Sequence, residues 1–258
     1  MTITIPTLWL ILIGLCLGSF LNVVILRDDK RQSILNDRSR CMHCDHLLAW
    51  YDLFPLLSFL SLRGRCRYCQ KPISWQYPTI EVLAALLLLF SFMIANREGG
   101  GLILAISLAL VCLIMLVISI IDVRTLYIPL EYCIAAALIG VIGNLWSGHL
   151  SFPDVILGAL LGGGVIAVIL YGWKLIFHQE GMGTGDIWMA ATIGAVVGYP
   201  LVGVALIFAF FVGALIGVLL MGTGQKTMQA ALPFGPFLFI GMLIALQWGQ
   251  SILQWYIL

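Results

Sequence analysis

The chain has 258 residues, of which 62% are hydrophobic and 10% are charged, and its mean hydropathy is +1.07. No soluble domain of this size needs so much apolar surface, so the composition indicates a polytopic membrane protein. The formal net charge of +1 gives no electrostatic reason to expect a nucleic-acid partner.

The first apolar run covers residues 6–26 and could be either a secretory signal or a retained membrane helix. It lacks a basic region before it, is too long for a signal core and shows no Ala-x-Ala cleavage site. Arg27, Lys30 and Arg31 follow it directly. These features favour a retained helix whose basic end stays in the cytosol.

Residues 27–78 read as a small water-exposed domain, because nine of the 13 Lys and Arg residues lie between Arg27 and Lys71. This segment also holds four of the seven cysteines, as two C-x-x-C pairs separated by 21 residues: Cys41, Cys44, Cys66 and Cys69. The pattern is typical of a structural zinc site with four thiolate ligands, in which the metal supplies folding energy that a short loop lacks. Two disulfides or unrelated free thiols are the alternatives, although disulfides rarely persist in the cytosol.

Seven further apolar runs follow, and each is expected to form a helix across the membrane. They cover residues 79–95, 102–121, 130–146, 154–174, 187–198, 201–221 and 233–256. The run 187–198 is short, so the region 187–221 could instead hold one span and a re-entrant piece. The sequence therefore predicts an all-α polytopic membrane protein with about eight transmembrane helices. Its parts would be a first helix at 1–26, the zinc-binding cytosolic domain at 27–78 and a membrane domain at 79–258.

Eight spans give a definite orientation, because they place three later loops on the same side as residues 27–78. Those loops carry Arg124, Lys174 and Lys226, and only Arg97 falls on the opposite side. Twelve of the 13 basic residues then lie on one face, in agreement with the positive-inside rule. Seven spans would break this agreement.

Two aspartates, Asp122 and Asp186, lie at the ends of apolar runs, where a carboxylate is costly to desolvate. The predicted topology places both at cytosolic helix ends. Two neighbouring carboxyls, one ionised and one protonated, are the minimum for aspartic-type hydrolysis. Each could instead cap a helix or reach toward water. Gly183 and Gly185 permit tight or positive-φ backbone geometry and remove side-chain bulk where an extended substrate would approach.

These features occur together with others that resemble one family, the type IV prepilin peptidases. The motifs that carry the resemblance are Gly14–Arg27, Arg38–Cys44, Trp50–Ser58, Leu62–Cys69, Ile73–Pro78 with Glu81, Ile121–Asp122 with Ile128–Pro129, Gly183–Asp186 and Pro233–Phe237. They extend over nearly the whole chain, and the Gly-x-Gly-Asp signature is shared with intramembrane aspartic proteases. The chain departs from the family pattern at Met42, Gln76, Leu130 and Trp188.

The resemblance implies an aspartic peptidase of the bacterial inner membrane, with Asp122 and Asp186 as catalytic residues facing the cytosol. It would cleave the leaders of type IV prepilins and pseudopilins and N-methylate the new N-terminus with S-adenosylmethionine. Its partners would be these substrates and the surrounding lipids. Gly183, Gly185 and Glu81 are the candidates for substrate binding. Glu81, a charge at the mouth of an apolar span, could instead contact the methyl donor.

Two other functions stay open at this point. One is a peptidase without methyltransferase activity. The other is a non-enzymatic transporter or assembly adaptor with a zinc-stabilised cytosolic domain, which has no particular need for the Gly183–Asp186 motif. The binding residues of the methyl donor are unknown. Asp45 and Asp52 could contact it, or they could be solvated surface charges.

Overall fold

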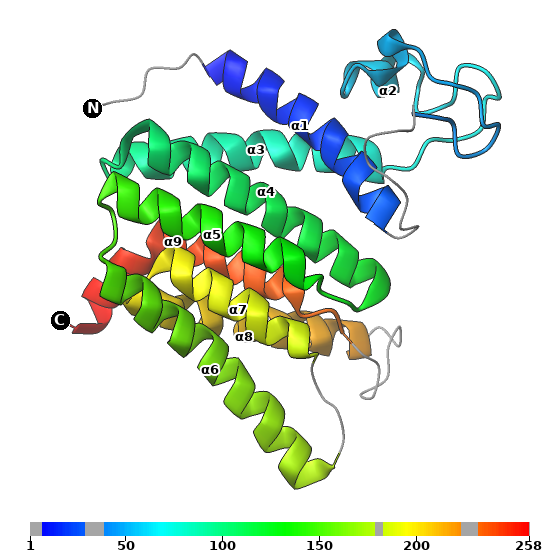
Figure 1. The fold of residues 1–258 in the computed structure, drawn as a ribbon. Helices are drawn as coiled ribbons and strands as arrows, with labels where there is room; N and C mark the ends of the chain where they lie inside the picture. Colours follow the sequence, from blue (N-terminus) through cyan, green and yellow to red (C-terminus); the bar gives the residue numbers. More distant parts are fainter. Residues whose placement is uncertain (1–6, 29–38, 179–182, 223–231, 258) are drawn as a thin grey trace. The chain divides into compact units, whose positions relative to one another are not determined.

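The computed structural model describes residues 7–28, 39–178, 183–222 and 232–257, and these ranges are largely helical (Figure 1). They form two compact units whose boundary falls inside a helix, between Met93 and Ile94. Four basic residues used in the orientation argument lie outside the described residues: Lys30, Arg31, Arg38 and Lys226.

The N-terminal unit contains two long helices with the cysteine-containing region between them. Its elements are α1 (Thr7–Asp28), the short 3-10 helix η1 (Trp50–Leu53), α2 (Leu57–Ser61) and the first part of α3 (Gln76–Arg97). Glycines let α1 and α3 approach closely. A Cβ on Gly14 would lie 2.4 Å from the Cα of Ala85, and one on Gly18 would lie 2.5 Å from the Cα of Glu81. Small residues allow this kind of close helix packing in a membrane.

The C-terminal unit contains the rest of α3 and six further helices. They are α4 (Gly101–Thr125), α5 (Leu130–Ser147), α6 (Phe152–Phe177), α7 (Thr184–Val197), α8 (Tyr199–Gly222) and α9 (Gly235–Ile257). Across the described residues of both units, seven helices are long and apolar enough to cross a membrane, and α7 is a shorter apolar helix. The all-helical membrane fold is therefore confirmed.

Helix α7 is the short element expected at 187–198. It has 14 residues, so it is about 21 Å long, which is less than the roughly 30 Å hydrocarbon core of a bilayer. Within the C-terminal unit α7 contacts α5, α6, α8 and α9. Because these neighbours bury most of α7, little of the helix faces lipid and its length need not match the bilayer. It begins at Thr184, earlier than the sequence predicts, so Asp186 lies inside its first turn.

Candidate active site and metal centre

Asp122 lies in the last turn of α4, and only 5% of its surface is exposed. The backbone N–H of Gly235, the first residue of α9, donates a hydrogen bond of 2.8 Å to Asp122 Oδ2. Helix α4 ends where Leu126 adopts a left-handed conformation with φ 55°. The chain then turns through Ile128 into α5. The carboxyl group is thus held at the junction of two helices that are distant in sequence.

Asp186 is also buried, with 6% of its surface exposed, and it lies in the first turn of α7. Its Oδ2 accepts a hydrogen bond of 3.2 Å from the backbone N–H of Gly183. Both aspartates therefore accept a glycine N–H at the start of a helix. Helix capping, the alternative role considered from the sequence, does occur at both positions. It is compatible with catalysis, because a carboxylate can accept several hydrogen bonds.

The start of α7 packs against the turn between α4 and α5. A Cβ on Gly185 would lie 2.6 Å from the Cβ of Ile128, so this approach requires glycine. As a result, Asp122 and Asp186 lie close enough for their charges to interact. Gly183 has φ −79°, and neither glycine is among the positive-φ residues. The tight geometry expected here is present at Gly185, and the positive-φ geometry is not.

The four cysteines of the two C-x-x-C pairs come together in the N-terminal unit. The sulfur atoms of Cys41, Cys44, Cys66 and Cys69 all lie within 4.8 Å of one another, and those of Cys41 and Cys69 are 3.9 Å apart. Thiolates bound tetrahedrally at about 2.3 Å from zinc lie roughly 3.8 Å apart. The donor set and its spacing therefore fit a four-coordinate metal ion such as zinc.

The two pairs are built in the same way. The N–H of the first cysteine of each pair bonds to a carbonyl five residues later, Cys41 to His46 and Cys66 to Lys71. One residue after each pair the backbone has a positive φ, at Asp45 and at Gln70. Each pair thus forms a tight turn that directs two thiols to one point, as a zinc knuckle does.

The protonation of the thiols shows why a cation would stabilise the cluster. Burial opposes ionisation of Cys41, but hydrogen bonds from the backbone of His43 and Cys44 outweigh it and lower the pKa of Cys41 to about 7. The backbone of His46 favours the Cys44 thiolate. The neighbouring thiols Cys41 and Cys69 outweigh that bond and raise the pKa of Cys44 to about 11. Four adjacent thiolates need a divalent cation.

Glu81 connects three segments of the N-terminal unit. Its carboxylate, on α3, accepts a hydrogen bond of 2.7 Å from the N–H of Leu56, and the Ser19 side chain of α1 also bonds to it. Leu56 has φ 59° and immediately precedes α2. This geometry supports a structural role for Glu81, and its contact with substrate stays a prediction.

Asp52 is bound within the cysteine-containing region. Its carboxylate accepts hydrogen bonds from Arg67 Nε at 2.8 Å and from the Tyr68 hydroxyl at 3.1 Å. Burial would raise the pKa of Asp52, but these two bonds outweigh it and hold the pKa below its ordinary value. The side chain of Asp52 is 3% exposed and forms an ion pair with Arg67, so Asp52 is not a solvated surface charge.

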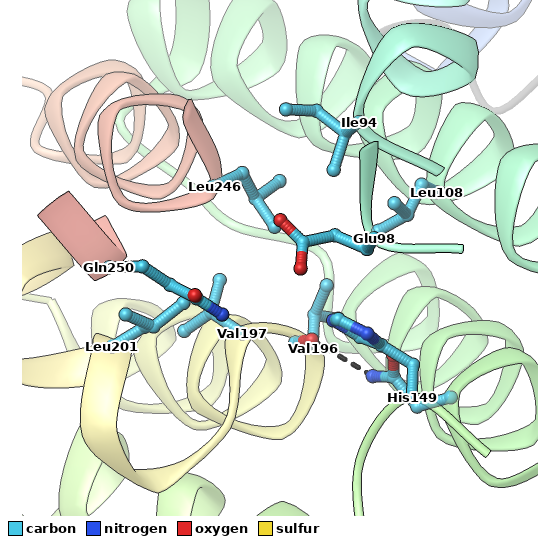
Figure 2. Close-up of a pocket in the computed structure, with 10 residues that line it drawn as sticks. Ile94, Glu98, Leu108, His149, Val196, Val197, Leu201, Leu246 and Gln250 are labelled. Carbon is cyan, nitrogen blue, oxygen red and sulfur yellow. Dashed lines mark hydrogen bonds between the residues drawn. The ribbon is translucent and has the colours of Figure 1, made fainter. Parts of the chain in front are cut away.

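A second polar cluster lies in the C-terminal unit, where α5 and α7 end and α8 begins. It surrounds a cavity of about 20 Å³ (Figure 2). Glu98 and His149 face each other across it, and Arg97 Nε donates to Glu98 at 2.9 Å. Asn144 also lines the cavity, donates to the carbonyl of Val196 at 2.9 Å and has an unpartnered, buried Oδ1. There is room for about one water molecule. A nucleoside such as the methyl donor does not fit.

Two parts of these sites are not apparent from the sequence. The hydrogen bond from Gly235 to Asp122 could not be predicted from side-chain patterns, because its donor is a backbone group 113 residues away. Its signal was the Gly and Pro cluster at the start of the last apolar run. The pair of Glu98 and His149 was not considered, although both are titratable residues beside apolar spans.

Two family models match the chain. Residues 12–95 match the Bacterial Peptidase A24 N-terminal domain, and residues 108–218 match the Type IV leader peptidase family. The four cysteines of the two C-x-x-C pairs fall in the first match. Asp122 and Asp186 fall in the second, whereas Gly235 lies beyond it. No solved structure matches the chain significantly.

Several curated proteins named prepilin leader peptidase/N-methyltransferase are similar over most of the chain. The protein of Aeromonas hydrophila is 34% identical over 270 residues, which cover 95% of this chain and 92% of that protein. The protein of Pseudomonas putida is 32% identical over 93% of this chain and 90% of its own length. The Myxococcus xanthus protein is 40% identical over 84% of this chain and 64% of its own length.

Proposed function

The chain belongs to the type IV leader peptidase family, and from that premise we propose that it is a prepilin peptidase and N-methyltransferase. It cleaves the leader peptides of prepilins and pseudopilins and then methylates the new N-terminal amine. The observation that carries the peptidase activity is the convergence of Asp122 and Asp186, two buried carboxyls on different helices whose charges interact.

Hydrolysis by this pair follows from the cost of two adjacent negative charges. Asp122 and Asp186 share one proton, because both cannot ionise at short range in a buried site. The ionised carboxylate takes a proton from water as the water attacks the scissile carbonyl carbon. The protonated carboxyl gives its proton to the carbonyl oxygen, which yields a tetrahedral diol. The carboxyl that took the water proton then gives it to the leaving nitrogen as the C–N bond breaks, and the other carboxylate takes back one diol proton as the carbonyl re-forms. The proton belongs to the pair rather than to either residue.

The surroundings of the pair are suited to an extended peptide. Gly183 and Gly185 present backbone without side chains beside Asp186, so a substrate strand can approach closely. We assign these glycines to substrate binding. Glu81 is the third substrate candidate, although its bonds to Leu56 and Ser19 give it a structural role as well.

The substrate and the membrane location are parts of the same proposal. The dyad lies at the cytosolic face of the bacterial inner membrane, where a prepilin presents a polar leader followed by an apolar helix. The basic residues support this orientation, since twelve of 13 fall on the predicted cytosolic side. The peptidase domain comprises residues 79–258.

Two bound groups belong to the proposal. Cys41, Cys44, Cys66 and Cys69 would hold a zinc ion, and four thiolate ligands would leave it no position for substrate, so its role would be structural. S-adenosylmethionine, when bound, supplies the methyl group, and we assign no residue to its binding. The accepting amine exists only after the leader is removed and must be deprotonated to react. Methylation therefore follows cleavage.

The experiment that tests the function uses purified full-length protein in detergent with a prepilin, with and without S-adenosylmethionine. Mass spectrometry of the product N-terminus is expected to show leader loss in both samples and an added methyl group, about 14 Da, only with the donor. Cleavage without methylation would leave a peptidase alone. Absence of cleavage by folded, zinc-loaded protein would favour the transporter or adaptor function.

A further inference from the structure

The geometry points to Gly235 as a positioning residue for Asp122, through its backbone N–H and its lack of a side chain. This inference rests on the proposed function, because it assumes that Asp122 is catalytic. It concerns the entry to α9, which no family match covers. The sequence analysis noted that entry only as a motif.

The backbone hydrogen bonds at the start of α9 single out Gly235. The first N–H groups of a helix have no partner within the helix. Here Phe237 and Leu238 both donate to the carbonyl of Phe234, and Pro236 has no N–H to satisfy. Gly235 alone among these residues donates outside the helix entry, and its acceptor is Asp122 Oδ2. The sequence Phe-Gly-Pro-Phe thus offers one aimed donor to one carboxylate.

Aromatic packing fixes the place from which this donor acts. The Phe234 ring lies 5.1 Å from Phe210 of α8 and 6.1 Å from Phe237 of α9. A Cβ on Gly213 of α8 would approach the Phe237 ring to 3.1 Å, so the two helices are in close contact here. The N–H of Gly235 is therefore held in place by the packing of the α9 entry against α8.

A side chain at position 235 would displace the carboxylate of Asp122. A Cβ at this position would lie 2.9 Å from Asp122 Oδ2 and 3.4 Å from Asp122 Cβ and Cγ. The glycine therefore permits a carboxylate to lie directly against the helix start. The hydrogen bond to Oδ2 also restrains the rotation of the Asp122 carboxylate. The orientation of this carboxylate determines where the shared proton and the attacking water lie relative to it.

The test compares Gly235→Ala with a matched glycine of the same helix. Gly235→Ala keeps the N–H but forces Asp122 to rotate. We expect kcat for a prepilin to fall roughly 100-fold with KM within about twofold, and the pH profile of kcat to change shape. In Gly241→Ala the new Cβ would meet the Ala205 carbonyl oxygen at 2.1 Å, far along α9. This control should lower thermal stability at least as much and leave the pH profile unchanged.

A second variant removes the need for a steric clash. Pro236→Ala leaves position 235 without a side chain but releases the fixed φ of the proline next to the donor. The aim of the Gly235 N–H then loosens, and the pH profile of kcat should change less than in Gly235→Ala. An unchanged profile in both Gly235→Ala and Pro236→Ala would overturn the inference. So would equal losses of kcat in Gly235→Ala and Gly241→Ala without a change in profile. Asp122→Asn distinguishes failure of the proposed function from failure of the positioning role. An active Asp122→Asn refutes the proposed function itself, whereas an inactive one with fully active Gly235→Ala refutes only the positioning.

Discussion

The cysteine cluster of the N-terminal unit and the aspartate pair of the C-terminal unit answer the same electrostatic problem in different ways. Each brings acidic side chains of one kind together, four thiols in one case and two carboxyls in the other. The thiols are arranged at the spacing of a tetrahedral ion, and Cys44 is exposed. The carboxyls are buried and accept N–H groups from glycines.

The difference shows how a cluster of like groups indicates its function. Four soft donors around one point are neutralised by a cation, which makes the cluster a structural element. Two carboxyls held by neutral N–H donors retain a proton between them, which makes the cluster reactive. The number of groups and the identity of their hydrogen-bond partners separate the two outcomes.

The largest expected effect breaks the reactive cluster without disturbing its geometry. Asp122→Asn and Asp186→Asn each keep an oxygen that can accept the glycine N–H, so the helix cap is retained. Each removes a member of the proton-sharing pair, and prepilin cleavage should fall at least about 1,000-fold. Cleavage is measured by mass spectrometry, and folding by the thermal midpoint in detergent.

Alanine at the same positions is the control for capping. Asp122→Ala and Asp186→Ala lose the cap as well, and we expect each to lower stability by about 1 kcal/mol relative to the asparagine variant. Near-normal cleavage by either asparagine variant would remove that residue from the catalytic pair.

The second prediction breaks the metal cluster. Cys66→Ser removes a buried ligand, so zinc content should fall from about one ion per chain toward zero. The cysteine-containing region should then become sensitive to limited proteolysis, because the metal supplies its folding energy. Cys112→Ser, which changes a buried cysteine outside the cluster, should keep full zinc content. A metal-free protein with a fully protease-resistant region would contradict the prediction.

The third prediction concerns Glu81, a single carboxylate that belongs to neither cluster. Glu81→Ala leaves the Leu56 N–H without its acceptor, and we expect a loss of about 1–3 kcal/mol in stability. Glu81→Gln keeps an acceptor oxygen and should lose much less. Thermal midpoints of both variants, with KM for prepilin, separate the roles. A several-fold rise in KM for the stable Gln variant would support substrate contact, and an unchanged KM would leave Glu81 structural.

The sequence predicts those parts of the sites that depend on helix ends and local spacing. Counting spans predicts that Asp122, at the end of one helix, and Asp186, at the start of another, lie on the same face of the membrane. Their nearness within that face depends on the packing of Gly185 against Ile128, which a span count does not give. The cysteine spacing predicts the four-ligand cluster for a similar reason, since each pair closes a local turn.

Backbone partners from distant segments could not be predicted. The bond from Gly235 to Asp122 depends on how α8 and α9 pack, and no side-chain pattern encodes it. The bond from Leu56 to Glu81 depends on a positive φ at a leucine, which sequence preferences do not favour. Helix α7 also begins earlier than the sequence predicts, because the Thr-Gly-Asp segment before the apolar run is part of the helix.

The smallest expected effect concerns the polar cluster around the small cavity. There the carboxylate of Glu98 faces the imidazole of His149, whereas in the aspartate pair one carboxyl faces another. Burial lowers the pKa of His149, and Glu98 opposes the shift. The unfolded chain has an ordinary histidine with a pKa near 6.5, so it binds the proton more readily than the folded protein does. Stability is therefore fully present above about pH 6.5 and declines as the pH falls through the lower folded pKa. His149→Gln should flatten this acid limb of the thermal midpoint by an amount equivalent to about 1 kcal/mol or less. A limb that is equally steep in the His149 variant would show that the acid sensitivity arises elsewhere.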